Sequence, residues 1–115
     1  MLQLKDGALV MGNQYTRAIT DAVQTVFNAH NWLAVVTSGR DSVHGANSYH
    51  AKDRALDIRV SMIPEADRQA IRERIKVLLP HFYDVVYEPE VVKDGVIVKG
   101  AHFHIEADEK KEHAK

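Results

Sequence analysis

Residues 102–106 alternate imidazole or carboxylate side chains with large apolar ones, in the order HFHIE. Because side chains on a β-strand point to opposite faces with a period of two, this order predicts a strand whose polar side chains share one face. Phe103 and Ile105 then share the other face and can enter a core. A helix would not sort the residues in this way, since positions two apart do not face each other. The fold must therefore hold this strand between a core and a polar cleft.

A second alternating run lies upstream at residues 55–60, in the order ALDIRV. Asp57 shares one face of this predicted strand with Ala55 and Arg59, and the apolar residues share the other. A buried carboxylate without a partner is costly, so Asp57 needs a cation or a hydrogen-bond network. Two such strands side by side would bring Asp57, His104 and the upstream His50 to one point.

Two imidazoles and one carboxylate suit a catalytic zinc ion, which takes three protein ligands and leaves a fourth position for water. His50, Asp57 and His104 are therefore candidate ligands of Zn²⁺, and the chemistry that this ion supports is hydrolysis near neutral pH. A non-haem iron oxygenase also uses two histidines and one carboxylate, and zinc is favoured here over iron.

Four short elements carry a resemblance to known proteins: Ser38-Gly39-Arg40, Ser48-Tyr49-His50, the pair Ala55 and Asp57, and His102-Phe103-His104. Together they resemble the zinc peptidases that include lysostaphin-type enzymes, D-Ala-D-Ala carboxypeptidases, phage L-Ala-D-Glu endolysins and the Hedgehog signalling domain. Asp53 stands where that family usually has glycine. Aspartate tolerates the left-handed backbone better than most residues, so the same turn is expected there.

The resemblance implies a set of site residues: Zn²⁺ ligands His50, Asp57 and His104, catalytic residues His102 and Arg40, and the substrate contact Ser48. Ala101 stands where another subgroup has a catalytic glutamate, so the chain groups with the His-x-His subgroup. His102 is then a general base, a donor to the transition state, or a support for a ligand. Arg40 is implied to stabilise the developing oxyanion, where one fixed donor contributes roughly 3 kcal/mol. Glu106 either forms an ion pair at the strand end or orients His104.

The resemblance also implies the substrate, the stem peptides of peptidoglycan. We expect cleavage of the L-Ala-D-Glu bond, as in phage endolysins, because the sequence is a compact domain without an export signal. The alternative within the family is a D-Ala-D-Ala carboxypeptidase or dipeptidase. The alternative from another class is a non-catalytic zinc-containing binding domain, because a shared fold does not determine function. A metal-dependent nuclease is disfavoured, since the sequence has no basic stripe for phosphates.

Composition narrows the possible partners. The formal net charge of −1 provides no broad attraction to nucleic acid or to membranes. The absence of cysteine excludes disulfides and thiolate zinc sites. Residues 1–10 contain no long apolar run, so we expect no signal peptide and no membrane insertion. We expect a monomer that is cytoplasmic until it is released, or that is associated with a phage particle.

Periodicity predicts the scaffold around the two alternating runs. The expected elements are helices at 15–30 and 65–79, strands at 32–37, 55–60, 83–87 and 102–106, a loop at 40–47, a hairpin at 91–98, and a fraying charged tail from 109. Asn13 or Thr16 can cap the first helix, Pro64 opens the second, and the hairpin turns at Asp94-Gly95. This order predicts one α+β domain over residues 1–115, with a mainly antiparallel sheet and two principal helices packed to one side. The resemblance implies the same architecture, that of the Hedgehog domain and the D-Ala-D-Ala peptidases.

Overall fold

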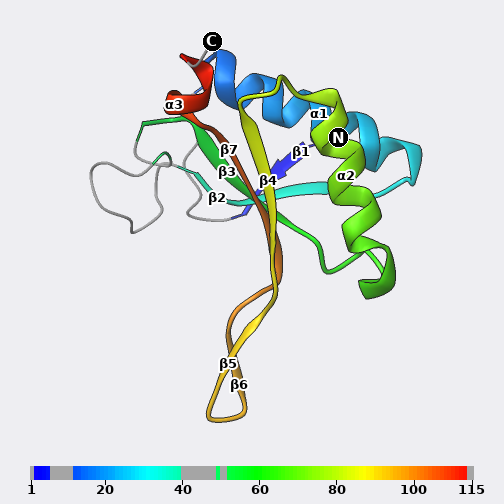
Figure 1. Cartoon of the computed structure of the whole chain (residues 1–115). Helices are drawn as coiled ribbons and strands as arrows, with labels where there is room; N and C mark the ends of the chain where they lie inside the picture. Colours follow the sequence, from blue (N-terminus) through cyan, green and yellow to red (C-terminus); the bar gives the residue numbers. More distant parts are fainter. Residues whose placement is uncertain (1, 6–11, 40–48, 50–51, 114–115) are drawn as a thin grey trace.

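The structure is a computed structural model that describes residues 2–5, 12–39, 49 and 52–113. Within these ranges the chain forms, in order, β1 (Leu2–Leu4), α1 (Gln14–Ala29), β2 (Ala34–Ser38), β3 (Ala55–Arg59), the 3₁₀ turn η1 (Glu65–Asp67), α2 (Arg68–Leu78), β4 (Tyr83–Glu88), β5 (Val91–Lys93), β6 (Val96–Lys99), β7 (His102–Ala107) and α3 (Glu109–Glu112). The predicted α+β class is confirmed, with two main helices, a five-stranded sheet and a separate hairpin (Figure 1). None of the helices in the described ranges has the length and apolar content needed to cross a membrane.

The five strands of the sheet are ordered β1-β2-β3-β7-β4. β1 pairs with β2 in parallel, and the other neighbouring strands are antiparallel. The sheet is therefore mixed, because an N-terminal strand that the sequence pattern did not predict joins its edge. Leu2–Leu4 is too short to show a periodicity, and it becomes a strand because β2 offers it an open edge.

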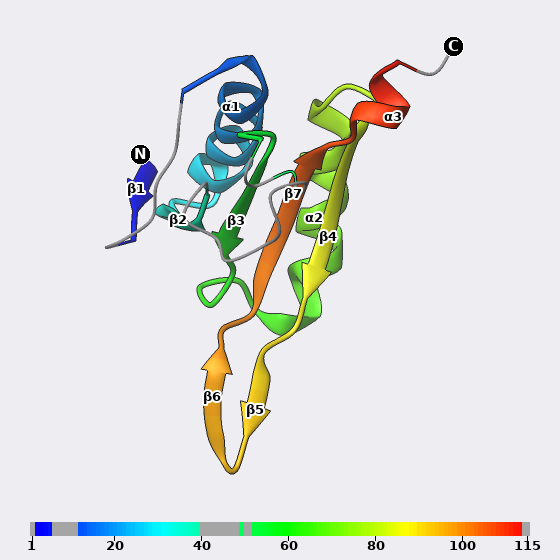
Figure 2. The ribbon, with the colours of Figure 1, turned by 90° about the vertical axis from the view of Figure 1, so that its left-hand side faces the viewer.

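Both main helices pack on the same face of the sheet (Figure 2). From β3 and β7, the apolar residues Leu56, Ile58, Phe103 and Ile105 point into this layer and are at most 1% exposed. They join the apolar stripes of α1 and α2 in one core. Fully burying each such side chain contributes about 1.5–3 kcal/mol, so the apolar half of each alternating strand decides which way the sheet faces. The polar half is left on the opposite face.

Local signals place the start of the first main helix. The Asn13 side chain accepts hydrogen bonds from the backbone nitrogens of Tyr15 and Thr16, both at 2.9 Å. The Thr16 hydroxyl in turn accepts from the Asn13 nitrogen at 3.2 Å, so both predicted capping residues take part in a capping box. The second helix begins later than predicted, because Glu65–Asp67 forms a 3₁₀ turn before α2 starts at Arg68.

The charged tail that the sequence predicts to fray contains the short helix α3 at Glu109–Glu112. Asp108 caps this helix by accepting from two backbone nitrogens of its first turn. Arg54 is 6% exposed, donates to Glu112 at 2.7 Å and lies over the ring of Tyr15. Arg54 and Glu112 are 58 positions apart, so no local pattern could predict that this segment is held in place.

Two turns have the left-handed backbone that the sequence predicts. Asp53 has a φ of 56°, at the position where the resembled family usually has glycine. Asp94 and Gly95 have φ values of 52° and 77°, and a two-residue type I′ hairpin turn requires positive values at both positions. The resulting hairpin of β5 and β6 projects beyond the sheet as an extension of β4 and β7 (Figures 1 and 2).

Candidate metal centre

Asp57 and His104 lie in contact on the polar face of the sheet. They are register partners on the antiparallel strands β3 and β7, so their side chains lie side by side. Oδ1 of Asp57 is 2.9 Å from Nδ1 of His104. Asp57 is only 3% exposed, and a carboxylate this buried requires a cation or hydrogen-bond donors. The structure thus brings together two of the residues that the sequence predicts as ligands.

The ring of His104 lies between two carboxylates. Its Nδ1 faces Asp57, and its Nε2 is 2.7 Å from Oε1 of Glu106 on the same strand. Burial lowers the pKa of His104, but the hydrogen bonds with Asp57 and Glu106 outweigh burial and raise the pKa from 6.5 to about 9. Glu106 thus contacts the His104 ring directly, and this contact is compatible with both roles that the sequence left open, an ion pair and the orientation of His104.

NMR titration of the chelator-treated protein is expected to give His104 a pKa near 9. Glu106→Gln should lower this pKa, because an amide oxygen stabilises an imidazolium less than a carboxylate does. Since the folded-state pKa exceeds the unfolded one, this contribution to the free energy of unfolding is fully present below pH 6.5 and is lost as the pH rises through about 9. The metal-free protein should accordingly melt at a lower temperature at high pH. Glu73→Gln, on the exposed side of α2, is the matched control and should leave the pKa of His104 unchanged. A pKa of His104 near 6.5 in the wild type would contradict the placement of its ring between Asp57 and Glu106.

A cation can take the place of a proton on either side of the His104 ring. At Nδ1 it would bind between His104 and Asp57, whereas at Nε2 it would bind between His104 and Glu106. The second pair has the His-x-carboxylate spacing of non-haem iron sites. The first pair is the better zinc site, because the Asp57 side chain is 4% exposed and that of Glu106 is 23% exposed. Glu106 then keeps its hydrogen bond and holds the ring, as carboxylates do for ligating imidazoles.

His102 lies beside this pair and is 3% exposed. Its Nδ1 is 2.9 Å from the carbonyl oxygen of Gly100, so a neutral ring that donates from Nδ1 presents the lone pair of Nε2. This Nε2 lies 3.9 Å from Oδ2 of Asp57 and 3.1 Å from Oε2 of Glu88. The contact with Glu88 is close but lacks hydrogen-bond geometry, and Nε2 has no hydrogen-bond partner among the described residues. The nitrogen is thus positioned to exchange a proton next to Asp57.

Glu88 is a residue of this centre that sequence reasoning missed. It ends β4 and is the register partner of His102 on β7, so the two side chains share the polar face. The sequence marks Glu88 only as a charged residue at the end of a predicted strand. Glu88 could have been predicted as a neighbour of His102 only from the order of the strands in the sheet. No local sequence pattern contains that order.

Three predicted site residues, Arg40, Ser48 and His50, lie outside the described residues. Their places relative to Asp57 and His104 stay predictions. The described part of the centre consists of Asp57 on β3, His102 and His104 on β7, and Glu88 on β4.

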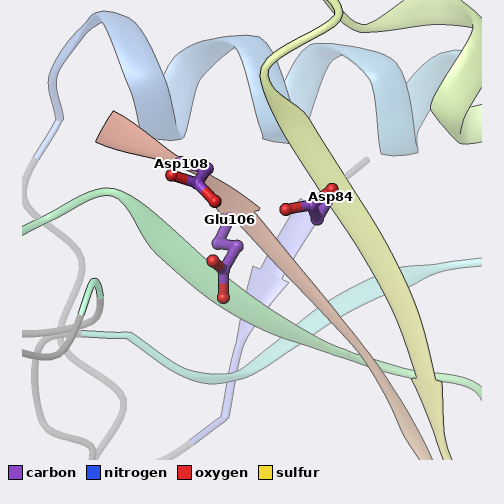
Figure 3. Close-up of side chains that lie close together, drawn as sticks. All are labelled: Asp84, Glu106 and Asp108. Carbon is purple, nitrogen blue, oxygen red and sulfur yellow. The ribbon is translucent and has the colours of Figure 1, made fainter. Parts of the chain in front are cut away.

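A second group of possible metal ligands lies toward the carboxyl end of β7. In the part of the chain that the structure describes, Asp84, Glu106 and Asp108 offer oxygens that lie within 4.8 Å of one another (Figure 3). Each already has a protein partner, and Asp84 is 2.7 Å from Nζ of Lys111. An all-oxygen set of partly exposed carboxylates suits hard cations such as Ca²⁺ better than zinc. We therefore place the candidate zinc centre on the buried side of His104.

A groove of about 640 Å³ opens beside Asp57 and His102. Its lining includes polar residues of the sheet and residues 97–101, which lead from the hairpin back into β7. This volume is that of a site for a small ligand or a short peptide. Asp57 and His102 both line the groove.

No protein-family model, curated protein or solved structure matches the chain.

Proposed function

We propose that the chain is a zinc-dependent peptidase that hydrolyses the stem peptides of peptidoglycan. The observation that carries this proposal is the 2.9 Å contact between Asp57 and His104, on a polar sheet face beside a groove. A carboxylate and an imidazole in this position can serve as two of the three protein ligands of a catalytic zinc site. We propose His50 as the third ligand, and the fold of the Hedgehog domain and the D-Ala-D-Ala peptidases as the family fold.

Two of the described residues, Asp57 and His104, have the chemistry of zinc ligands. Asp57 carries a negative charge that is almost fully buried, and a divalent cation beside it would offset the cost of that burial. His104 offers a nitrogen on the same side, and Glu106 holds the ring from the other. Bound Zn²⁺ would supply a Lewis acid for the scissile carbonyl and lower the pKa of a coordinated water.

The protein's own part in the reaction is to move protons and to bind charge. Nε2 of His102 would accept a proton from the attacking water and return it to the leaving nitrogen, so that the C–N bond breaks into a carboxylate and an amine. The carboxylates of Asp57 and Glu88 would stabilise the imidazolium that His102 becomes. We propose that Arg40 stabilises the oxyanion and that Ser48 contacts the substrate, both from outside the described residues.

Mass spectrometry of digested cell walls tests this proposal. We expect the zinc-loaded protein to cut the L-Ala-D-Glu bond, which exposes a new amino group on D-Glu and leaves L-Ala on the sugar. The chelator-treated protein and Asp57→Ala should give no product. Free D-Ala as the sole product would assign the chain to the carboxypeptidases or dipeptidases instead.

The same experiment separates the peptidase from a zinc-containing binding domain. The projecting hairpin exposes several apolar side chains, among them Val92, Val96 and Ile97, which is a surface that a binding domain could use. No product from any wall type, with zinc bound to the protein, would favour that alternative.

A further inference from the structure

We propose that Arg59 binds a free carboxylate of the substrate, so that the groove selects acidic peptides. This inference rests on the proposed peptidase function and names the chemistry by which that site chooses its substrate. Arg59 is the last residue of β3 and the register partner of His102 on β7. Its side chain therefore lies on the polar face, next to the residue that we propose moves protons.

Arg59 differs in its contacts from Arg68 and Lys99, two other basic residues that line the groove. No hydrogen bond or ion pair joins its side chain to any of the residues that the structure describes. Arg68, by contrast, donates to a backbone oxygen at 3.0 Å and to the hydroxyl of Tyr87 at 2.9 Å. Nζ of Lys99 lies 3.9 Å from Oε2 of Glu88. A partly buried guanidinium without a protein partner is costly, and an anionic ligand would supply the missing partner.

The lining of the groove carries an excess of positive charge. Four basic and two acidic side chains line it: Lys5, Arg59, Arg68 and Lys99, and Asp57 and Glu90. A zinc ion on Asp57 would add further positive charge. A cleft lined mostly by one sign of charge concentrates ligands of the opposite sign. The planar fork of a guanidinium matches a carboxylate with two parallel hydrogen bonds, so an unpaired arginine in such a cleft favours a carboxylate ligand.

The proposed substrate offers such a carboxylate close to the bond that is cut. Glutamate has two carboxyl groups, so a D-Glu residue that is joined to the next residue through one of them keeps the other free. With the L-Ala-D-Glu bond at His102, the free carboxylate of D-Glu would lie near Arg59, the neighbour of His102 across the strands. Amidation of that carboxylate would remove its charge and with it the charge-assisted hydrogen bonds.

The test compares two synthetic stem tripeptides, L-Ala-D-Glu-L-Lys with the free D-Glu carboxyl and the same peptide with that carboxyl amidated. Their L-Ala-D-Glu bonds are N-methylated to prevent cleavage. Isothermal titration of the zinc-loaded full chain should show the acid binding about 10- to 100-fold more tightly than the amide. Arg59→Met should bind both peptides as weakly as the wild type binds the amide. Arg59→Lys keeps the charge without the fork and should give an intermediate preference. Arg17→Met, which removes an exposed arginine of α1, is the matched control and should keep the full preference.

Equal affinity of the wild type for acid and amide, or no binding of either at millimolar peptide, would overturn the role of Arg59. A preference for the acid that survives in Arg59→Met would overturn it as well. Failure of the proposed peptidase function would give a different result. A protein that prefers the acid peptide through Arg59 but cleaves no cell wall would support the anion site and contradict the peptidase reaction. Wall cleavage without any acid preference retains the reaction and removes Arg59 from substrate selection.

Discussion

His102→Ala is expected to lower kcat on peptidoglycan stem peptides roughly 10²–10⁴-fold, with the zinc content of the wild type retained. The ring of His102 is held through Nδ1 by the carbonyl of Gly100 at 2.9 Å, and its Nε2 lies beside Asp57. Alanine removes this proton-transferring group and leaves Asp57 and His104 unchanged as ligands. The measurement is the rate at which new amines are released from purified walls, with zinc determined by elemental analysis on the same sample.

His81→Ala provides the matched control, because His81 is exposed at the turn before β4. It should keep both zinc and turnover. Loss of zinc from His102→Ala would make His102 a metal ligand. Unchanged turnover with zinc bound would exclude His102 as the residue that moves the proton.

Removal of zinc is expected to lower the melting temperature by about 10–20 °C. Zinc present at about a thousand times its Kd and bound to the native state alone contributes about 4 kcal/mol to the free energy of unfolding. In a domain of 115 residues each kcal/mol shifts the melting temperature by a few degrees. The measurement is thermal unfolding before chelation, after chelation and after zinc is restored, with about one zinc per chain expected by elemental analysis.

The affinity for zinc should also fall as the pH falls, because His104 must lose its proton to become a ligand. With a His104 pKa of about 9, the apparent Kd should weaken about tenfold for each pH unit below that value. The dependence therefore extends above the ordinary histidine range, and a zinc titration at several pH values measures it. A Kd that is constant between pH 7 and about 9 would contradict ligation by His104.

Two carboxylate variants locate the zinc. Asp57→Asn should abolish zinc binding, whereas Asp84→Asn, in the partly exposed acidic group shown in Figure 3, should keep about one zinc per chain. The opposite result would move the centre to Asp84, Glu106 and Asp108. A melting temperature that is the same with and without saturating zinc would contradict a site formed in the native protein.

The placing of Asp57 and of His104 on the polar faces of their strands could be predicted from the sequence, because the direction of a side chain on a strand depends on local backbone geometry alone. The pairing that sets Asp57 opposite His104 is tertiary. Alternation at 55–60 and 102–106 specifies which residues share a face, and burial of the apolar half specifies which face is covered. The cap at Asn13 and the turn at Asp94-Gly95 are local in the same sense, since each depends on a few consecutive residues.

Tertiary structure alone decided which other side chains surround this pair. Glu88 lies beside His102 because β4, and no other strand, adds to the free edge of β7. Arg59 lines a groove because residues 97–101, which lead from the hairpin back into β7, line the same groove. The segment 109–112 is held as a helix because Arg54, far away in sequence, donates to Glu112. Each of these contacts joins residues that are distant along the chain, and packing of the whole core determines whether they form. No periodicity in the sequence records that packing, so alternation could predict which residues share the polar face of each strand and could not predict which of them meet there.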